Sequence, residues 1–263
     1  SVELEARFQL DRLKEHACIV LWCGNNEIAS GWLSWGWKEK LPDSVWKDYD
    51  KLFHQLLPRI CKELDPGRLY WPSSPCHGTD QSNQDQIYGK GDNHYWGVWH
   101  GGDDFNSFDD NVGRFMTEYG MQSFPSMSMI ESFTNEKDRS LDSDVMNAHQ
   151  KASLGTGNLM KYVEDYYQVN DDFDSIAGLS QIMQAEAIRF AVEAHRRNMP
   201  YCMGTLYWQF NDCWPVISWS SIDYGGNWKA LHYAARKFFS PILVSIRDLD
   251  DKIEIHVIND QHH

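Results

Sequence analysis

Two carboxylic acids in this sequence follow apolar stretches and lie beside aromatic residues. Glu27 ends the stretch Leu-Trp-Cys-Gly-Asn-Asn-Glu, and Glu118 ends the stretch Arg-Phe-Met-Thr-Glu. A side chain at the carboxyl end of a parallel strand faces the site that such sheets build there. With two carboxyl groups in one site, one can donate a proton to a leaving oxygen while the other attacks or activates water. Two such carboxyl groups are the minimum that hydrolysis of a glycosidic bond requires.

Alternating strands and helices must position these acids. Apolar residues at helical spacing predict amphipathic helices, and short apolar runs bounded by turn residues predict strands. The helix over residues 43–64 should begin with a cap from Asp43 or Ser44 and be kinked at Pro58. The strand over residues 18–23 should be a buried parallel strand. The expected helices cover residues 2–17, 43–64, 142–167 and 175–197, and the expected strands cover residues 18–23, 69–74, 94–100, 114–118 and 204–212.

This order of elements predicts an α/β fold with a parallel sheet wrapped in helices. The candidates are a doubly wound sheet and a (β/α)8 TIM barrel. A doubly wound nucleotide fold should carry a glycine-rich phosphate loop, and no GxGxxG or Walker sequence occurs. Polar or acidic residues instead end all five expected strands. The sequence therefore predicts the C-terminal portion of a TIM barrel, with about five β/α units.

The C-terminal residues follow a different pattern. The stretch Lys-Ile-Glu-Ile-His-Val-Ile-Asn over residues 252–259 alternates at period two, which predicts a strand of an antiparallel sheet. We therefore expect residues 1–243 to form the TIM-barrel portion and residues 244–263 to form the first strand of a following β-sandwich domain. Because a barrel needs more strands than the sequence supplies, we also expect this chain to be a fragment of a longer enzyme.

Composition narrows the class of partner. The formal net charge of -14 repels phosphate backbones and no basic run occurs, so neither nucleic acid nor an anionic membrane surface is an expected partner. No apolar run approaches the ~20 residues that span a bilayer. The N-terminal residues lack the regions of a signal peptide, and the compartment stays unassigned. The cysteines form no CxxC pair, and no His, Cys and Asp cluster has metal spacing, so no metal or cofactor is expected.

Aromatic residues are abundant, with 12 Trp and 12 Tyr. Aromatic faces with polar edges suit flat, partly apolar ligands such as sugar rings. Bulky packing in the core is the alternative explanation for them.

Five longer motifs occur in order along the chain. They are His-Ala-Cys-Ile-Val-Leu-Trp-Cys-Gly-Asn-Asn-Glu at residues 16–27, Asp-Asn-His-Tyr-Trp-Gly-Val-Trp-His-Gly at 92–101, Phe-Met-Thr-Glu-Tyr-Gly-Met-Gln-Ser at 115–123, Gln-Ala-Glu-Ala-Ile at 184–188 and Gly-Thr-Leu-Tyr-Trp-Gln-Phe-Asn-Asp-Cys-Trp-Pro at 204–215. Together they resemble signatures of the β-mannosidases of glycoside hydrolase family 2. The resemblance extends from residue 1 to about residue 245.

This resemblance implies a retaining exo-β-mannosidase that removes terminal non-reducing β-D-mannose. Glu27 then lies at the end of barrel strand 4 as the acid/base, and Glu118 lies at the end of strand 7 as the nucleophile. In retaining enzymes the two carboxyl groups lie about 5 to 5.5 Å apart. The charge on Glu118 should therefore keep Glu27 protonated for the first step, and its loss on esterification should let Glu27 act as a base.

The resemblance also implies the residues that bind substrate. Asn26 matches the asparagine that bonds the sugar 2-hydroxyl, and a turn or helix cap is its alternative role. Trp35 resembles a tryptophan that lines the sugar site, although it could equally belong to the core. Trp208 matches the platform of the mannose subsite, which is often followed by a non-proline cis peptide. His94 and Trp96 lie on the strand that supplies groups near the nucleophile in related barrels, and a core histidine is the alternative for His94.

Members of this family carry further parts that are not in the 263 residues. These are an N-terminal sugar-binding β-sandwich, an immunoglobulin-like domain and the first three barrel strands. The expected partners are therefore a β-mannoside or mannooligosaccharide substrate and the missing domains and strands of the same polypeptide. Two alternatives stay open. One is another family 2 exo-glycosidase, acting on a galactoside, glucuronide or glucosaminide, and the other is a non-catalytic carbohydrate-binding fragment.

Overall fold

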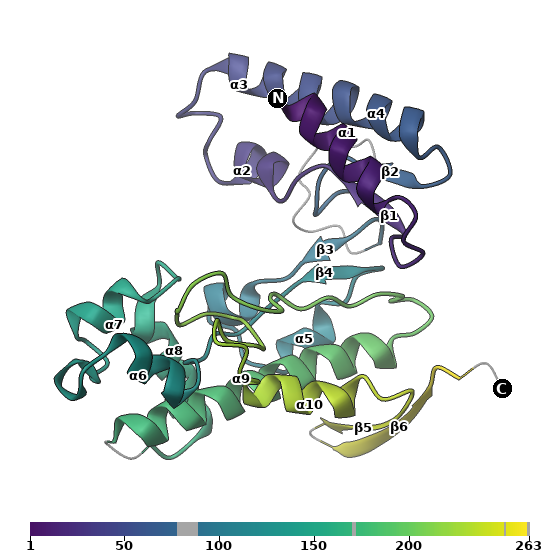
Figure 1. Ribbon diagram of the computed structural model, residues 1–263. Helices are drawn as coiled ribbons and strands as arrows, with labels where there is room; N and C mark the ends of the chain where they lie inside the picture. Colours follow the sequence, from purple (N-terminus) through teal and green to yellow (C-terminus); the bar gives the residue numbers. More distant parts are fainter. Residues whose placement is uncertain (78–88, 170–171, 250, 262–263) are drawn as a thin grey trace. The chain divides into compact units, whose positions relative to one another are not determined.

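The computed structural model describes residues 1–77, 89–169, 172–249 and 251–261 (Figure 1). Residues 73–93 are polar and rich in turn residues, which predicts a loop, and residues 78–88 of this segment lie outside the described part. The chain forms two compact units, which we describe separately. Unit 1 comprises residues 1–94 and 113–117, and unit 2 comprises residues 95–112 and 118–263. No helix among the described residues is long and apolar enough to span a membrane.

Unit 1 is built on a pair of short parallel strands covered by helices. Strand β1 (Leu21–Cys23) pairs in parallel with β2 (Leu69–Trp71). Helix α1 (Val2–Leu13) packs against α4 (Leu57–Leu64), and both lie over this pair in Figure 1. Leu10, Ile60 and Cys61 form the buried cluster between them, and Trp22 and Tyr70 pack against it from the strands. The other elements of unit 1 are α2 (Ile28–Ser34), α3 (Asp43–Tyr49), η1 (Asp50–Leu56), β3 (Asn93–His94) and the first residues of β4 (Met116–Glu118).

The expectation that the first strand is buried is wrong. Leu21 is 41% exposed and Cys23 is also exposed. Successive side chains of a strand point to opposite faces, and only the face that carries Trp22 is covered by the helices. Leu21 and Cys23 therefore lie on the uncovered face.

The expected helix over residues 43–64 is present, with two differences. It begins at Asp43 behind Pro42, whose position at the N-cap leaves the helix without a side-chain cap, so the expected cap from Asp43 or Ser44 is absent. The turns before Pro58 form the π-helix η1. Proline lacks the N–H that the preceding turn would bond, and a wider turn accommodates that loss. The predicted kink thus takes the form of a π-helical segment.

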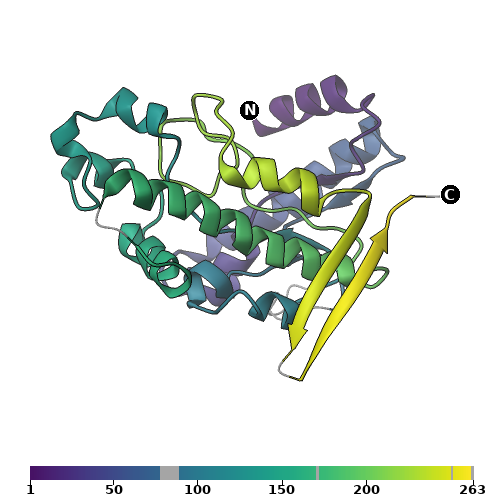
Figure 2. The ribbon, with the colours of Figure 1, turned by 90° about the horizontal axis from the view of Figure 1, so that it is seen from below.

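Unit 2 is organised around one long helix. Helix α9 (Phe173–Arg197) is capped by the Asp172 carboxylate, which accepts from the backbone N–H of Ser175 at 2.8 Å. Helices α5, α8 and α10 contact α9, and Figure 2 shows α10 alongside it. The buried face of α9 is rich in alanine, which lets these helices approach closely. The elements are α5 (Ser107–Asp110), α6 (Met127–Phe133), α7 (Asp144–Ala148), α8 (Gly155–Tyr166), α10 (Ala230–Phe238), β5 (Ile242–Leu249) and β6 (Lys252–Asn259), with the short helical segments η3 (Gly97–Gly101) and η4 (Glu136–Asp138).

One expected strand is much shorter than predicted, and another does not form. The strand over residues 94–100 ends at His94, because the backbone N–H groups of His100 and Gly101 both bond the carbonyl of Trp96 and close a tight turn. The strand over residues 204–212 forms no ladder, because successive residues bond different neighbours. Trp208 N donates to Tyr119 O at 2.8 Å, whereas Gln209 N donates to Trp219 O at 3.2 Å.

The expected helical region over residues 142–167 is divided into α7 and α8. The chain leaves the first helix at His149, whose carbonyl accepts from the N–H of Ile217 at 2.7 Å. Gly155 then begins α8 with φ +72°. A bridge to a distant segment therefore overrides the helical spacing.

The C-terminal residues form an antiparallel hairpin of β5 and β6. The strand predicted over residues 252–259 is confirmed as β6. Strand β5 was not expected, because Leu243 on the inner face interrupts the alternation. The inner face of the hairpin packs toward α9, whereas the outer face exposes a set of β-branched apolar residues, namely Ile242, Val244, Ile246, Ile253, Ile255 and Val257.

Candidate active site

Glu27 lies in unit 1 at the junction of β1 and α2. Its backbone N–H donates to Ser74 O at 2.8 Å, and its carbonyl accepts from Gly31 N at 2.8 Å in the first turn of α2. The backbone of Glu27 has φ 59° and ψ 9°, a left-handed conformation that is uncommon for residues other than glycine. Such conformations cluster at functional sites, because the surrounding structure must hold them in place.

Asn25 provides the hydrogen bonds that hold this junction. Its Oδ1 accepts from Ile28 N at 3.1 Å, and its Nδ2 donates to Pro72 O at 2.8 Å. The capping role considered for Asn26 therefore belongs to Asn25. Within the described part of the chain, the side chain of Asn26 makes no hydrogen bond, while its backbone forms a parallel bridge with Ser74.

Gly24 allows the ends of β1 and β2 to approach. A Cβ atom at this position would lie 2.4 Å from the Tyr70 hydroxyl and 2.5 Å from the carbonyl oxygen of Pro72. Every other residue type would therefore displace the loop that carries Asn26 and Glu27.

His94 lies beside Glu27. Its Nδ1 is 2.6 Å from Glu27 Oε1, and the side chains are 4% and 18% exposed, respectively. Its Nε2 lies 2.9 Å from Ser74 Oγ. The side chain of His94 is thus buried, as expected for a core histidine, and it also contacts Glu27, the predicted acid/base.

Asp92 is a buried carboxylate that sequence reasoning did not single out. It accepts from Trp71 Nε1 at 3.0 Å, Ser74 Oγ at 2.6 Å, Cys76 N at 2.8 Å and Thr117 Oγ1 at 2.8 Å. The one feature of the sequence that could have pointed to Asp92 is its place at the start of the motif over residues 92–101. Three of the donors lie within residues 71–76 and the fourth at residue 117, so all four are distant in sequence from Asp92 and no local pattern around it revealed them.

The tryptophans that follow Glu27 are divided between core and surface. Trp32 is 5% exposed and stacks on Trp46 at 5.4 Å between ring centroids. Trp35 is 49% exposed and meets Trp37 edge to face at 5.8 Å. Trp35 is therefore not a core residue, and its role in lining the sugar site stays a prediction.

Glu118 ends β4 and belongs to unit 2. Its backbone carbonyl accepts from Tyr95 N at 3.0 Å, and the residue is 7% exposed. The neighbouring Tyr119 is fully buried, and its hydroxyl lies 2.6 Å from Thr205 Oγ1. Burial raises the pKa of Tyr119 well above its usual value, so this phenol stays neutral. The expected separation of the Glu27 and Glu118 carboxyl groups joins residues of different units and stays a prediction.

Trp96 and Trp208 come together around Gly120. A Cβ atom at Gly120 would lie 2.5 Å from the Trp208 carbonyl oxygen and 3.0 Å from the Trp96 ring. Only glycine therefore lets the chain after Glu118 pass so close to these residues. Trp208 is 39% exposed, and the peptide bond between Trp208 and Gln209 is cis, as the resemblance implied.

Two buried side chains hold the segments around this cluster. Gln184 of α9 donates through Nε2 to the carbonyls of Met121 at 2.8 Å and Trp219 at 3.0 Å. Lys229 donates to the carbonyls of Ser123 at 3.4 Å and Ser218 at 3.3 Å. Burial lowers the pKa of Lys229 to about 7, and the nearby aspartates offset part of that effect.

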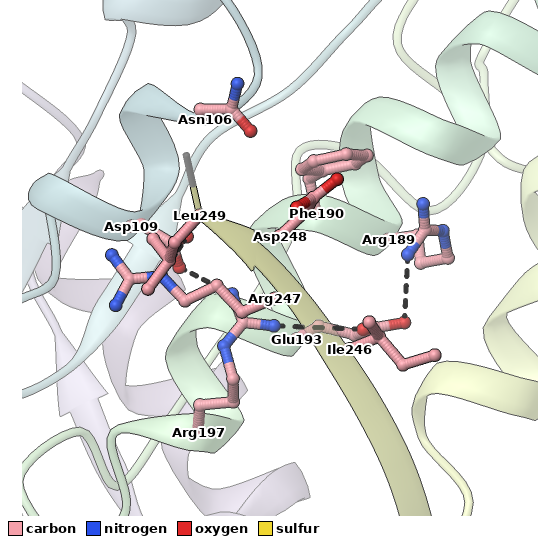
Figure 3. Close-up of a pocket in the computed structure, with 10 residues that line it drawn as sticks. All are labelled: Asn106, Asp109, Arg189, Phe190, Glu193, Arg197, Ile246, Arg247, Asp248 and Leu249. Atoms are coloured by element: carbon pink, nitrogen blue, oxygen red, sulfur yellow. Dashed lines mark hydrogen bonds and ion pairs between the residues drawn. The ribbon is translucent and has the colours of Figure 1, made fainter. Parts of the chain in front are cut away.

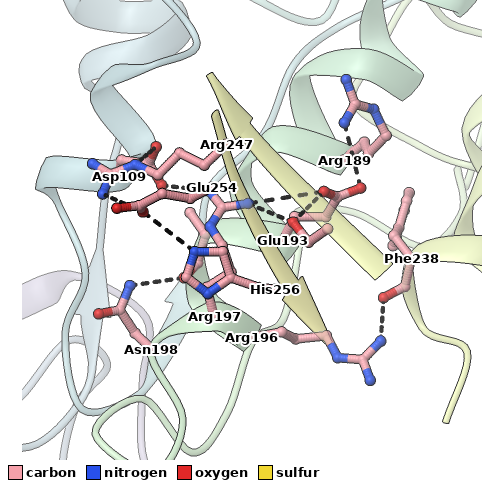
Figure 4. Close-up of polar contacts among 12 residues, drawn as sticks. Asp109, Arg189, Glu193, Arg196, Arg197, Asn198, Phe238, Arg247, Glu254 and His256 are labelled. Atoms are coloured by element: carbon pink, nitrogen blue, oxygen red, sulfur yellow. Dashed lines mark hydrogen bonds and ion pairs between the residues drawn. The ribbon is translucent and has the colours of Figure 1, made fainter. Parts of the chain in front are cut away.

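A cleft of ≈ 710 Å³ elsewhere in unit 2 is lined by residues of α9 and β5 together with Asn106 and Asp109 (Figure 3). None of the predicted site residues lines it. Its arginines are paired with acids (Figure 4). Arg197 and Arg247 both bond Asp109, and Arg197 also donates to Ser245 Oγ at 2.6 Å. This network holds the hairpin against α9. The positive charges of the arginines are neutralised by the acids that they bond.

The class of protein follows from the likeness to solved structures. The exo-chitosanase of Amycolatopsis orientalis matches with a TM-score of 0.66 and 17% identity, over 98% of this chain and 29% of that chain, which shows the fold alone. The β-D-mannosidase of Dictyoglomus thermophilum matches with a TM-score of 0.88 and 38% identity, over 98% of this chain and 31% of that chain. The neighbours in structure are thus glycoside hydrolases.

Sequence relatives narrow this class. No protein-family model matches the chain. Beta-mannosidase B of Aspergillus fumigatus is 35% identical over 259 residues, and that of Emericella nidulans is 36% identical over 259 residues. In both cases the match covers 94% of this chain and 30% of the relative. The chain is therefore homologous to a segment of the β-mannosidases, which confirms the resemblance carried by the motifs, and it spans about a third of the length of these curated relatives.

Proposed function

We propose that this chain carries the catalytic residues of a retaining exo-β-mannosidase that removes terminal non-reducing β-D-mannose from β-mannosides. The observation that carries the proposal is the junction around Glu27, where a strained backbone and His94 hold a carboxyl group at the end of a parallel strand. The homology to β-mannosidases supports the substrate.

In the proposed reaction, Glu27 donates its proton to the glycosidic oxygen while Glu118 attacks the anomeric carbon. The bond to the leaving group breaks, and an ester forms between the sugar and Glu118. Glu27 then takes a proton from water, which attacks the same carbon and releases mannose and the free Glu118 carboxylate. Asn26 would bond the sugar 2-hydroxyl, and Trp208 would form the floor of the subsite, with Trp35, His94 and Trp96 around it.

We further propose that residues 1–243 form the C-terminal portion of a TIM barrel and that residues 244–263 begin a β-sandwich domain. The parallel pairing of β1 with β2 and the polar residues after each strand support the barrel. The exposed apolar face of the hairpin supports the sandwich, because two sheets pack through such faces. The remaining strands and the covering sheet would come from the same polypeptide, since the relatives are longer.

The roles of the two acids are tested by their dependence on the leaving group. In the whole enzyme, Glu118→Ala should abolish turnover of every substrate. Glu27→Ala should spare aryl mannosides whose leaving groups need no protonation and lose mannobiose hydrolysis by about 10²-fold or more. Glu164→Ala, a change at an exposed acid of α8, serves as the control. Equal losses on both substrates in the Glu27 variant would contradict its role.

A covalent label tests the nucleophile. Incubation with a 2-fluoro-mannosyl fluoride, followed by peptide mapping, should place a stable adduct on Glu118. Turnover of aryl galactosides, glucuronides or glucosaminides in preference to mannosides would support another exo-glycosidase, a possibility raised by the exo-chitosanase fold. Sugar binding without turnover, unchanged by Glu118→Gln, would instead indicate a carbohydrate-binding fragment.

A further inference from the structure

A chain of hydrogen bonds in unit 1 connects Asp92 to Glu27. Asp92 Oδ2 lies 2.6 Å from Ser74 Oγ, Ser74 Oγ lies 2.9 Å from His94 Nε2, and His94 Nδ1 lies 2.6 Å from Glu27 Oε1. The Glu27 end of this chain is the proposed acid/base. The Asp92 end is buried, with 7% of the residue exposed.

The donors around Asp92 fix the direction of each bond. Its two oxygens face two N–H groups, from Trp71 and Cys76, and two hydroxyl groups, from Ser74 and Thr117. The two N–H groups can only donate, and both hydroxyl groups donate to Oδ2, so the oxygens of Asp92 act as acceptors in all four contacts. The single proton of the Ser74 hydroxyl therefore points at Asp92.

The orientation of Ser74 then determines the tautomer of His94. Because the Ser74 proton is used, the oxygen of Ser74 can only accept from the ring, so Nε2 of His94 carries a hydrogen. In the neutral ring Nδ1 is then a lone pair that faces Glu27 Oε1. Their contact at 2.6 Å requires one shared proton, either on the carboxyl group or on Nδ1.

We propose that Ser74 and Asp92 are positioning residues that hold His94 as the Nε2–H tautomer, so that Glu27 begins the reaction as an acid. This inference rests on the proposed function of Glu27. In the free enzyme the protonated carboxyl group donates a hydrogen bond to the Nδ1 lone pair, which favours the protonated form. When substrate binds, the leaving oxygen replaces Nδ1 as the acceptor and receives this proton in the first step. The resulting carboxylate faces the same lone pair, which favours its taking a proton from water in the second step.

Thr117 offers a matched control. Its hydroxyl also donates to Asp92 Oδ2, at 2.8 Å, and belongs to the same unit. Thr117→Val therefore removes one donor from Asp92 and leaves the contact between Ser74 and His94 in place. Ser74→Ala removes the acceptor of His94 Nε2 as well. Comparison of the two variants separates a general loss of packing from a loss of tautomer control.

The first test measures the tautomer directly and does not depend on activity. Nitrogen-15 NMR of the histidine rings in the whole enzyme, with His94→Gln used to assign the signals, should show His94 protonated at Nε2. Ser74→Ala should populate the Nδ1–H form, and Thr117→Val should not. A wild-type ring that carries a hydrogen on Nδ1, whether neutral or doubly protonated, would overturn the proposal.

The second test uses the leaving group. Ser74→Ala should reduce kcat/KM for mannobiose at least about tenfold more than for an activated aryl mannoside, because only the former needs the acid. Labelling of Glu118 by 2-fluoro-mannosyl fluoride should persist. Thr117→Val, and Ser74→Thr, which restores the hydroxyl, should affect both substrates equally. An equal loss on both substrates in Ser74→Ala would show a merely structural role, whereas a wild-type enzyme that neither turns over mannosides nor is labelled would refute the proposed function itself.

Discussion

Some single residues adopt a conformation or an environment that lowers the stability of the folded chain. Glu27 holds a left-handed backbone, and its carboxyl group is placed against a histidine nitrogen. His195 of α9 is another such residue, because it is 1% exposed and its Nε2 has no hydrogen-bond partner in the described part of the chain. Its Nδ1 lies 2.8 Å from Thr205 Oγ1, which links α9 to the segment before Trp208.

We expect His195 to make the stability of the protein depend on pH. Burial, reinforced by the charge of Arg197, lowers the pKa of His195 to about 3. Between pH ~6.5 and pH ~3 the unfolded chain therefore binds a proton that the folded chain does not, so stability falls as pH falls through this range. The slope contributed by one such group is up to about 1.4 kcal/mol per pH unit.

Urea unfolding of wild type and His195→Gln at pH 7.0, 5.5 and 4.5 measures this effect. The difference in free energy of unfolding between wild type and variant should shrink progressively as the pH is lowered. His16→Gln, at an exposed histidine, should differ from wild type by the same amount at each pH. A difference between wild type and His195→Gln that does not change with pH would contradict the prediction.

At the scale of elements, α9 serves as the support for the segments that carry Trp208 and follow Glu118. Its Gln184 is fully buried and donates to the carbonyls of Met121, after Glu118, and of Trp219, while its oxygen accepts from Ser123 Oγ at 2.8 Å. The Trp219 carbonyl also accepts from Gln209 N, next to Trp208. Each buried polar group left without a partner costs about 1–3 kcal/mol. Gln184 thus ties α9 to the segments that contain Met121 and Trp219.

We expect Gln184→Leu to lower the free energy of unfolding by at least about 3 kcal/mol, since several carbonyls would lose their donor together. Chemical denaturation monitored by tryptophan fluorescence measures this change. Ile182→Ala, on the exposed face of the same helix, should cost less than about 1 kcal/mol. Comparable losses of unfolding free energy in the two variants would show that the hydrogen bonds of Gln184 do not hold these segments to α9.

The elements differ in how far the sequence predicts them. Helix α9 and strand β6 follow strong local patterns, and their predicted bounds differ from the observed ones by two residues at most. The segments over 94–100 and 204–212 have the composition of strands, yet their hydrogen bonds go to different neighbours, which no local pattern contains. The motifs identified Glu27 and His94 individually. Their link through Ser74 to Asp92 depends on contacts between distant segments.

The hairpin at the C-terminal end of the molecule exposes a large apolar face. One face of the hairpin carries six β-branched apolar residues that are 52% exposed or more. The other face is anchored to α9 through Ser245, which bonds Glu193, and to α5 through Arg247, which bonds Asp109. A hairpin that is fixed on its inner face and exposes an apolar outer face is oriented to receive a second sheet, which is the sandwich proposed for residues 244–263.

We expect this face to behave differently in the chain and in the longer polypeptide proposed above. Ile246 and Ile255 are directly paired across the hairpin, and threonine preserves the β-branched shape at both positions. The double variant Ile246→Thr, Ile255→Thr should reduce self-association of the 263-residue chain, measured by sedimentation, without lowering its stability. In the longer polypeptide the same change should destabilise the sandwich by about 1.5–3 kcal/mol per side chain, because both isoleucines would be buried.

The inner face of the hairpin supplies the control for this comparison. Leu243 and Ile258 are also directly paired, and they are 8% and 9% exposed. Leu243→Thr with Ile258→Thr should therefore destabilise the chain and the longer polypeptide alike. If the Ile246 and Ile255 variant changed neither the association of the chain nor the stability of the longer polypeptide, this face would not be a sheet interface, because covering it with a second sheet must remove its apolar area from water.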